Sequence, residues 1–423
     1  MTIMHPVQQT ERAKAVLFTV ASTHSAEIDA LLDELSALVE AAGAEVLGRM
    51  IQCKAHPDPA LFLGSGKVRE LKALCASLGC GIAICDDELS PSQQRNLEKE
   101  LELKVLDRTQ VILDIFAARA SSAEGKMQVE LAQLAYILPR LRGKGVEMSG
   151  LGASARGIRT RGPGETKLEY DRRRIKSRMA DLKGQVDELD QHRSLARSQR
   201  AARGVPTVAF VGYTNAGKSS LLNALTEGGA LVENKLFATL DPTARELTLP
   251  DGRTVMLVDT VGFVRKLPHQ LIKAFRATLA EVRQADLLLH VVDISHPDAL
   301  LQLQTVLTVL TELEAADKPM VTALNKMDKV SELPPLPELG STIPISALHR
   351  TNLGRLASAI AEGLSDRPVR TRFVIPFTRG DLLGLLHAKG DVLSTNHTEA
   401  GTEVVVDVLQ RYANKVEAEL SKA

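Results

Sequence analysis

The chain has 423 residues, of which 44% are hydrophobic and 25% are charged. This composition is ordinary for a folded protein, and the length allows two to four domains, each with its own core. Lysine and arginine number 52 together, as do aspartate and glutamate, so the total charge does not indicate a nucleic-acid partner. No apolar run is long enough to cross a bilayer. The four cysteines lack any C-x-x-C spacing and are expected to be small buried hydrophobes. We expect a monomeric, cytoplasmic protein.

Residues 1–120 predict an N-terminal α/β domain. Short apolar runs alternate with segments of helical periodicity, and this alternation favours a largely parallel sheet. The expected strands are residues 15–20, 44–51, 81–85 and 104–106, and the expected helices are 27–40, 67–78 and 92–101.

Residues 121–203 predict an antiparallel helical hairpin. Two series of apolar residues recur at steps of three and four, which is typical of a coiled-coil seam. The connection between them, about 142–164, is rich in glycine and has no aromatic residue. A loop of that length is normally functional or disordered. The two series are Met127, Leu131, Leu134, Leu138 and Leu141, and Ile175, Met179, Leu182, Val186 and Leu189.

This hairpin carries an excess of positive charge. Between Arg140 and Arg178 there are 12 lysine or arginine residues against 4 acidic ones, an excess of 12 − 4 = 8. Positive charge on a slender projection suits contact with RNA phosphates, and the lack of aromatic residues argues against base stacking. A solvated basic loop is the alternative. The candidate RNA-binding residues are Arg142, Lys144, Arg156, Arg159 and Arg161.

Residues 204–364 predict a P-loop GTPase domain. GYTNAGKS at 212–219 follows an apolar strand and precedes a helix. In this motif the glycines let backbone N–H groups wrap phosphates. Lys218 would span the β- and γ-phosphates, and the Ser219 hydroxyl would coordinate Mg²⁺. In FATLDPT, at 237–243, Thr239 is the expected second hydroxyl ligand of Mg²⁺ in a loop that senses the γ-phosphate. A loop threonine without a role is the alternative.

Three later motifs complete a guanine-nucleotide site. In DTVG, at 259–262, Asp259 would hold a magnesium-bound water and the Gly262 N–H would donate to the γ-phosphate. In NKMD, at 325–328, Asp328 would accept two hydrogen bonds from guanine, which adenine cannot supply. Asn325 and Lys326 would brace the base, and the backbone of Ala347 in SAL, at 346–348, would face the guanine oxygen.

The whole predicted nucleotide-binding set comprises Gly212, Tyr213, Thr214, Asn215, Ala216, Gly217, Lys218, Ser219, Phe237, Ala238, Thr239, Leu240, Asp241, Asp259, Thr260, Val261, Gly262, Asn325, Lys326, Met327, Asp328, Ser346, Ala347 and Leu348.

No catalytic residue can be named from these motifs. Phe263 stands where many GTPases place a glutamine that orients the attacking water, and a phenyl ring cannot do so. We therefore expect slow hydrolysis by the isolated chain, with a partner or another residue near 263–270 supplying the geometry. His269 is a candidate, although an exposed loop histidine is the simpler interpretation. Asn215 resembles the asparagine with which potassium-dependent GTPases hold a K⁺ ion.

Residues 371–423 predict a small C-terminal α/β domain, reading strand, helix, strand, turn, strand and a charged helix. A short linker containing Asp366, Arg367 and Pro368 precedes it.

With VGYTNAGKSSLLN, LFATLDPTAR, DTVGFV and the upstream GIRTRGPGETKLEYDRRR, the chain closely resembles the HflX family of ribosome-associated GTPases from about residue 15 to the end of the nucleotide domain. The resemblance implies an N-terminal α/β domain, a helical hairpin, a GTPase domain and a small C-terminal domain. It also implies binding to the large ribosomal subunit and its rRNA, and splitting of stalled or idle ribosomes with GTP hydrolysis for release. Some relatives use ATP through the N-terminal domain, and GSGK at 64–67 is a candidate phosphate contact, although a turn at a helix start explains it as well.

Two other functions remain open at this stage. A ribosome-assembly or RNA-modification GTPase would share the basic projection, and a signalling or transport switch would bind a protein partner with weak salt dependence.

Overall fold

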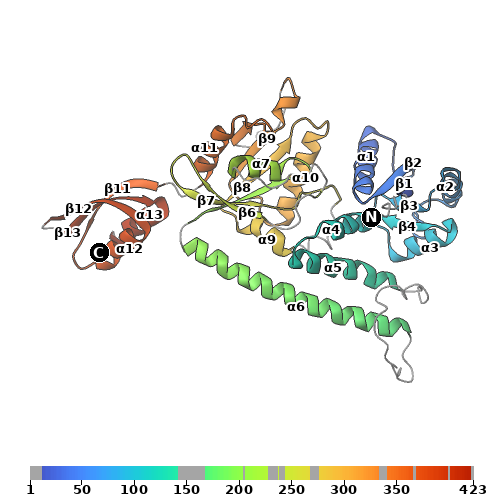
Figure 1. The fold of residues 1–423 in the computed structure, drawn as a ribbon, viewed down its shortest axis with the longest axis horizontal. Coiled ribbons are helices and arrows are strands. Elements are labelled where there is room, and N and C mark those ends of the chain that lie inside the picture. The colour runs from blue at the N-terminus through green and yellow to red at the C-terminus, as the bar shows by residue number, and fades with distance from the viewer. Residues whose placement is uncertain are drawn as a thin grey trace, which may run out of the picture. The chain divides into compact units, whose positions relative to one another are not determined.

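The computed structural model describes residues 12–141, 167–202, 205–226, 237, 243–266, 276–332, 341–364, 368–398 and 401–420. The chain divides into two compact units. The first contains residues 1–193 with 232–242 and 261–280, and the second contains residues 194–231, 243–260 and 281–423. Figure 1 labels the helices and strands.

The first unit contains a four-stranded, wholly parallel sheet in the order β2-β1-β3-β4, which confirms the predicted α/β architecture. The inner strand β1 has four consecutive fully buried residues at 15–18, as expected for a strand covered on both faces. The strands are β1 (Ala13–Ala21), β2 (Ala44–Cys53), β3 (Ile82–Cys85) and β4 (Lys104–Asp107), and the helices are α1 (Ala26–Ala41), α2 (Ser65–Leu78), α3 (Pro91–Leu101) and α4 (Arg108–Arg119).

The middle region is the predicted helical hairpin. Helix α5 (Ala123–Ile137) and the long helix α6 (Lys167–Ala202) run in opposite directions (Figure 1). Three of the five residues expected in the apolar series on α6, Ile175, Leu182 and Val186, are buried whereas most of their neighbours are exposed, and Met179 and Leu189 are half-buried. A bidentate contact joins the helices: Arg178 Nε and Nη2 donate to the two Glu130 carboxylate oxygens at 2.7 and 2.8 Å.

The apolar series predicted for α5 is only partly correct. Its most buried apolar residues are Val129, Ala132 and Tyr136, whereas four of the five predicted positions, 127, 131, 134 and 138, are half-buried. The reason is that α5 also packs against α4, so two of its faces are covered. The helix ends at Ile137 and continues as a 3₁₀ turn over Leu138–Leu141, because Pro139 lacks the N–H that a further α-helical turn needs.

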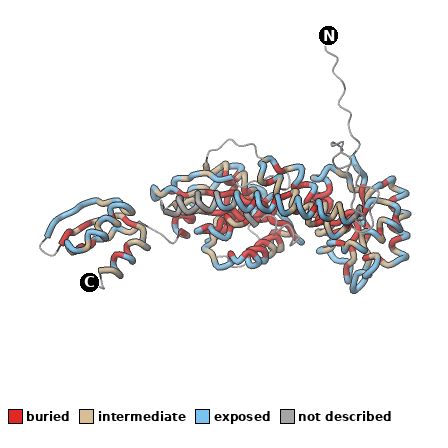
Figure 2. Tube along the Cα trace, turned by 90° about the horizontal axis from the view of Figure 1, so that it is seen from below, coloured by how far each residue is buried: buried red, intermediate tan, exposed pale blue. Residues whose placement is uncertain are grey.

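The GTPase sheet of the second unit has six strands in the order β10-β9-β8-β5-β7-β6. All neighbours are parallel except β6 and β7. All seven residues of β8 are buried, and Figure 2 shows the buried segments running through the interior of this region. The elements are β5 (Thr207–Gly212), α7 (Lys218–Thr226), β6 (Thr243–Thr248), β7 (Thr254–Asp259), α9 (Arg276–Gln284), β8 (Leu287–Asp293), α10 (Ala299–Glu312), β9 (Met320–Asn325), β10 (Ser341–Pro344) and α11 (Leu353–Gly363).

One buried histidine lies in this sheet. His290 on β8 pairs in register with Thr322 on β9, and neither side chain has a hydrogen-bond partner among the described residues. Burial lowers the pKa of His290 to about 4, with a smaller contribution from the positive charge of Lys218. The imidazole is therefore neutral at physiological pH.

The C-terminal segment forms a small antiparallel sheet in the order β11-β13-β12, so the predicted small α/β domain is confirmed. The central strand buries Val404, Val406 and Val408 against Leu386 and Val416 of the two helices. The elements are β11 (Pro368–Ile375), α12 (Gly380–Lys389), β12 (Gly390–Thr398), β13 (Gly401–Leu409) and α13 (Gln410–Leu420).

Two smaller expectations have mixed outcomes. Cys75, Cys80 and Cys85 are buried, as predicted, but Cys53 at the end of β2 is exposed. Among the described residues, no helix combines the length and the apolar character that a membrane span requires.

The neutral His290 predicts an acid-sensitive sheet. Its pKa is about 4 in the folded chain and about 6.5 when unfolded, so the unfolded state gains protons first as pH falls. Between pH 7 and pH 5 this histidine should remove about 2 kcal/mol from the free energy of opening β8. His290→Leu should abolish that part of the loss. Hydrogen exchange of β8 amides, corrected for intrinsic pH dependence, measures it. Equal losses in both proteins would contradict the prediction.

Candidate guanine-nucleotide site

The phosphate-loop motif forms the turn between β5 and α7, as its sequence predicts. Gly212 ends the strand and Lys218 begins the helix. Gly212 has φ +155°, and a Cβ there would lie 2.3 Å from the carbonyl oxygen of Val291 on the neighbouring strand β8. Only glycine fits at this position.

Asn325 connects the phosphate loop to the other two guanine motifs. Its side-chain Nδ2 donates to the Ala216 carbonyl oxygen at 2.9 Å, and its Oδ1 accepts from the Ala347 N–H at 3.0 Å. A Cβ on Gly217 would lie 2.3 Å from Nδ2, so this glycine is needed for the Asn325 contact. The buried amide of Asn325 therefore braces loops, and the guanine oxygen would have to share the Ala347 N–H with it.

Lys218 is buried in the phosphate loop. Its Nζ donates to the carbonyl oxygens of Gly212 and Tyr213 at 3.1 and 2.9 Å. Burial lowers its pKa to about 8, a shift that the nearby negative charge of Asp259 opposes. The ammonium is thus held beside the loop that would receive the phosphates.

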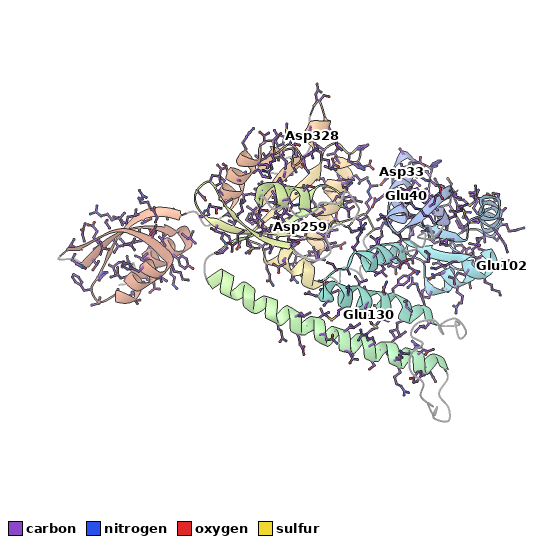
Figure 3. The ribbon with its side chains drawn as sticks, in the orientation of Figure 1. Asp33, Glu40, Glu102, Glu130, Asp259 and Asp328 are labelled. Carbon is purple, nitrogen blue, oxygen red and sulfur yellow. The ribbon has the colours of Figure 1, made fainter. Side chains whose placement is uncertain are left out.

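Ser219 and Asp259 meet at the expected magnesium position. The Ser219 Oγ donates to the buried Asp259 Oδ2 at 2.6 Å, which brings together a hydroxyl and a carboxylate oxygen. Mg²⁺ prefers such hard oxygen ligands and usually takes its remaining ones from phosphates and water. These two residues therefore fit the ion. Figure 3 labels Asp259 and Asp328 in this unit.

Lys326 adopts the left-handed backbone conformation, with φ +64°. Its Nζ donates to the Asn215 carbonyl oxygen of the phosphate loop at 3.0 Å and to Asp293 Oδ2 at 2.6 Å. The NKMD motif is thus tied to the phosphate loop through both Asn325 and Lys326.

Asp328 is oriented by the SAL motif. The Ser346 Oγ donates to Asp328 Oδ1 at 2.6 Å, and this bond is the main reason that the pKa of Asp328 lies below its usual range. The carboxylate is therefore ionised and accepts hydrogen bonds only, as guanine recognition requires. The neighbouring Leu348 side chain is 77% exposed.

The segment after DTVG contacts the N-terminal elements of the first unit through Lys266. Phe263 is buried. Lys266 Nζ forms ion pairs of 2.6 Å with both Asp86 and Asp87, and Asp86 in turn accepts from the buried Arg108 at 2.7 Å.

Phe237, the first residue of the predicted switch loop, packs edge-on against Phe116 of α4, with ring centroids 4.6 Å apart. The other switch-loop residues named from the sequence, 238–241, lie outside the described residues, as do His269 and the five candidate RNA-binding residues.

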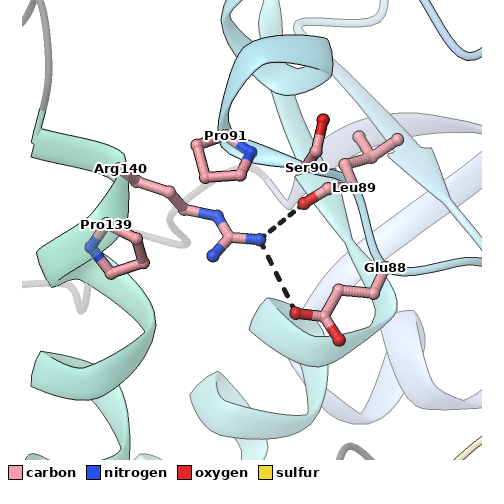
Figure 4. Close-up of a pocket in the computed structure, with 6 residues that line it drawn as sticks. All are labelled: Glu88, Leu89, Ser90, Pro91, Pro139 and Arg140. Atoms are coloured by element: carbon pink, nitrogen blue, oxygen red, sulfur yellow. Dashed lines mark hydrogen bonds and ion pairs between the residues drawn. The ribbon is translucent and has the colours of Figure 1, made fainter. Parts of the chain in front are cut away.

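The GSGK segment and a pocket near the end of α5 both lie in the first unit. At GSGK, Gly64 precedes α2 and Lys67 pairs with Glu70, which is the turn and helix start that the sequence allowed. A pocket of about 350 Å³ near the end of α5 is lined by Glu88, Leu89, Ser90, Pro91, Pro139 and Arg140 (Figure 4).

The arginine in that pocket is bound internally. Arg140 donates to the Leu89 carbonyl oxygen at 2.7 Å, to Gln94 at 3.0 Å and to Asp107 at 3.3 Å. It anchors the 3₁₀ turn to the sheet immediately before the basic loop.

Comparison with known proteins agrees with these motifs. The family model described as 50S ribosome-binding GTPase matches residues 207–326, and models described as GTP-binding GTPase N-terminal and Middle Region match 29–117 and 119–200. GTPase HflX of Caldanaerobacter subterraneus is 46% identical over 398 residues, covering 94% of this chain and 91% of its own. GTPase HflX of Escherichia coli K12 is 40% identical over 375 residues, covering 87% of each chain.

The chain belongs to the HflX family of GTPases. A solved GTP-binding protein from Sulfolobus solfataricus in complex with GDP is 28% identical and covers 83% of this chain and 98% of its own, with a TM-score of 0.41.

Sequence reasoning missed Asp293. It ends β8 beside the NKMD strand, and functional groups commonly follow the carboxyl ends of parallel strands. That position was the available signal, but nothing in the sequence shows that Asp293 pairs with Lys326.

The lowered pKa of Lys218 predicts pH-dependent nucleotide binding. Its protonated form should bind phosphates, so affinity is fully present well below pH 8 and is lost as pH rises through the pKa of about 8. We expect the dissociation constant for GDP to rise about fourfold between pH 7.0 and 8.5. Calorimetry in buffers of different ionisation enthalpy should show proton uptake on binding near pH 8. A constant affinity without proton uptake would refute this assignment.

Asp328→Asn should shift the preference from guanine towards xanthine nucleotides. The Ser346 hydroxyl can still donate to the amide oxygen, which leaves the amide nitrogen as a donor where Oδ2 stood. Xanthine offers a carbonyl there instead of an amine. We expect GDP affinity to fall at least about 100-fold and xanthosine diphosphate to bind more tightly than GDP. Competition against a fluorescent nucleotide measures both, and unchanged GDP affinity would show that the pocket is wrongly assigned.

Proposed function

We propose that this chain is a GTP hydrolase that binds the large ribosomal subunit and splits or rescues stalled or idle ribosomes, with hydrolysis driving release. The observation that best supports nucleotide binding is that the Asn325 side chain joins three guanine motifs, namely NKMD, the phosphate loop and SAL. Membership of a family whose GTPase model is described as 50S ribosome-binding supports the ribosomal half.

In the proposed site, Lys218 neutralises the β- and γ-phosphates. Ser219 and Thr239 would hold Mg²⁺, and Asp259 would act on the ion through a water molecule. Bound Mg²⁺ supplies charge stabilisation to the transferring phosphoryl group. The Ser219–Asp259 contact supports this assignment. Asn215, on the exposed turn of the phosphate loop, is the proposed partner of a K⁺ ion, because it resembles the asparagine that holds K⁺ in potassium-dependent GTPases.

Hydrolysis by the isolated chain is proposed to be slow. Phe263 follows DTVG and is buried, so it offers no polar group that could orient a water molecule. The ribosome is the proposed source of the missing geometry, through a group of its own or through rearrangement of the segment after Gly262.

The basic hairpin is the proposed ribosome-binding element. Residues 140–178 carry 12 basic and 4 acidic residues in a chain that is neutral overall. Helices α5 and α6, joined by the Arg178–Glu130 contact, support the loop on a narrow stem. Arginines in such a loop can contact rRNA phosphates, and the lack of aromatic residues at 142–164 argues against base stacking.

The proposal predicts that intact ribosomes treated with this protein separate into subunits on a sucrose gradient. Wild-type protein with a non-hydrolysable GTP analogue should convert intact ribosomes into subunits and migrate with the large one. Arg159→Glu with Arg161→Glu should abolish this migration, because like charges repel the phosphates, while GDP affinity stays within about twofold of wild type.

A matched control changes the net charge equally elsewhere. Arg355→Glu with Lys415→Glu replaces exposed cations on α11 and α13, and its migration should remain that of the wild type. Undiminished binding by the loop variant would refute the proposed RNA contact. Binding without splitting would favour a ribosome-assembly or RNA-modification GTPase, which is the alternative that the basic loop also fits.

A further inference from the structure

We propose that Asp293 is a positioning residue for guanine-nucleotide binding, acting through Lys326. It holds the lysine ammonium between the end of β8 and the phosphate loop. This inference rests on the proposed nucleotide site, in which NKMD contacts the base.

The sheet brings Asp293 to this position. Strands β8 and β9 are parallel neighbours in which Asp293 pairs with Asn325, and the N–H of Ile294 donates to the Asn325 carbonyl oxygen at 3.2 Å. The carboxylate therefore leaves β8 beside the residue where NKMD begins. The left-handed backbone of Lys326 is part of the same turn, and its Nζ lies 2.6 Å from Asp293 Oδ2.

The carboxylate is itself held from its other side. Ser295 donates to Asp293 Oδ1 through Oγ at 2.6 Å and through its N–H at 3.0 Å. The side chains of Asp293 and Lys326 are only 11% and 22% exposed. Both carboxylate oxygens are thus occupied and largely shielded, so the ion pair is stronger than a typical surface pair.

The consequence concerns the lysine and the phosphate loop together. Lys326 Nζ also donates to the Asn215 carbonyl oxygen at 3.0 Å, and the ion pair with Asp293 fixes the ammonium where it can do so. Without the carboxylate, the long flexible lysine is no longer confined to this position. Nucleotide affinity should then fall, whereas the chemical step should not change, because Lys218, Ser219 and Asp259 are untouched.

The test separates binding from chemistry. For Asp293→Asn we expect the dissociation constants of GDP and of a non-hydrolysable GTP analogue to rise about tenfold, the scale of one charge-assisted hydrogen bond. The single-turnover hydrolysis rate at saturating GTP should stay within about twofold of wild type. Glu314→Gln, which removes the exposed partner of the Arg283 ion pair in the same domain, is the matched control and should leave both quantities unchanged.

A double-mutant cycle decides whether Asp293 acts through Lys326. In the Lys326→Met background, Asp293→Asn should cause no further loss of affinity. A full additional tenfold loss would overturn the inference, as would wild-type affinity in Asp293→Asn alone. Ser295→Ala keeps the ion pair and the backbone N–H bond to Oδ1 but removes the hydroxyl bond to Oδ1, and we expect a loss of about threefold; it carries the test if Asp293→Asn does not fold.

The outcome for wild-type protein distinguishes the two proposals. Failure of the wild type to bind GDP would overturn the proposed nucleotide site and this inference with it. Tight wild-type binding that Asp293→Asn and Ser295→Ala leave unchanged would overturn only the role of Asp293.

Discussion

The side-chain amide of Asn325 is the interaction on which the nucleotide site depends. Its two hydrogen bonds, to the Ala216 carbonyl and from the Ala347 N–H, join loops that are far apart in the sequence. Because a buried amide must satisfy both its donor and its acceptor, the loops cannot move apart without leaving a polar group unpaired. The glycine at 217 is a requirement of this contact. The shape of the phosphate loop therefore depends partly on Asn325, which lies at the end of another strand, β9.

The charged groups around that amide are ion-paired or hydrogen-bonded. Lys326 faces Asp293, and Ser219 faces Asp259, while Lys218 donates to two backbone carbonyl oxygens. Buried charges are costly unless paired or hydrogen-bonded. Each of these ions therefore already has a partner within the protein.

Much of the architecture was predictable because it follows from local periodicity. The parallel N-terminal sheet, the apolar series on α6 and the strand–loop–helix context of GYTNAGKS all appear at or near the expected residues. The exceptions depend on tertiary contacts. The face that α5 turns towards α4 cannot be read from one helix, and the pairing of Asp293 with Lys326 requires knowledge that β8 and β9 are neighbours. The motif predicts that Asn325 lies beside the base. Its role in bracing the phosphate loop and the SAL motif depends on distances that no motif contains.

Arg140 and Arg178 show how structure modifies a charge count. Both belong to the twelve basic residues of the hairpin segment, yet Arg140 lies against Asp107 and Arg178 against Glu130, two acids outside that segment. Because counterion release on binding RNA scales with the phosphates that a protein neutralises, the slope of affinity against salt concentration should be shallower than twelve cations would give. Two of the arginines stiffen the stem instead of contributing to that slope.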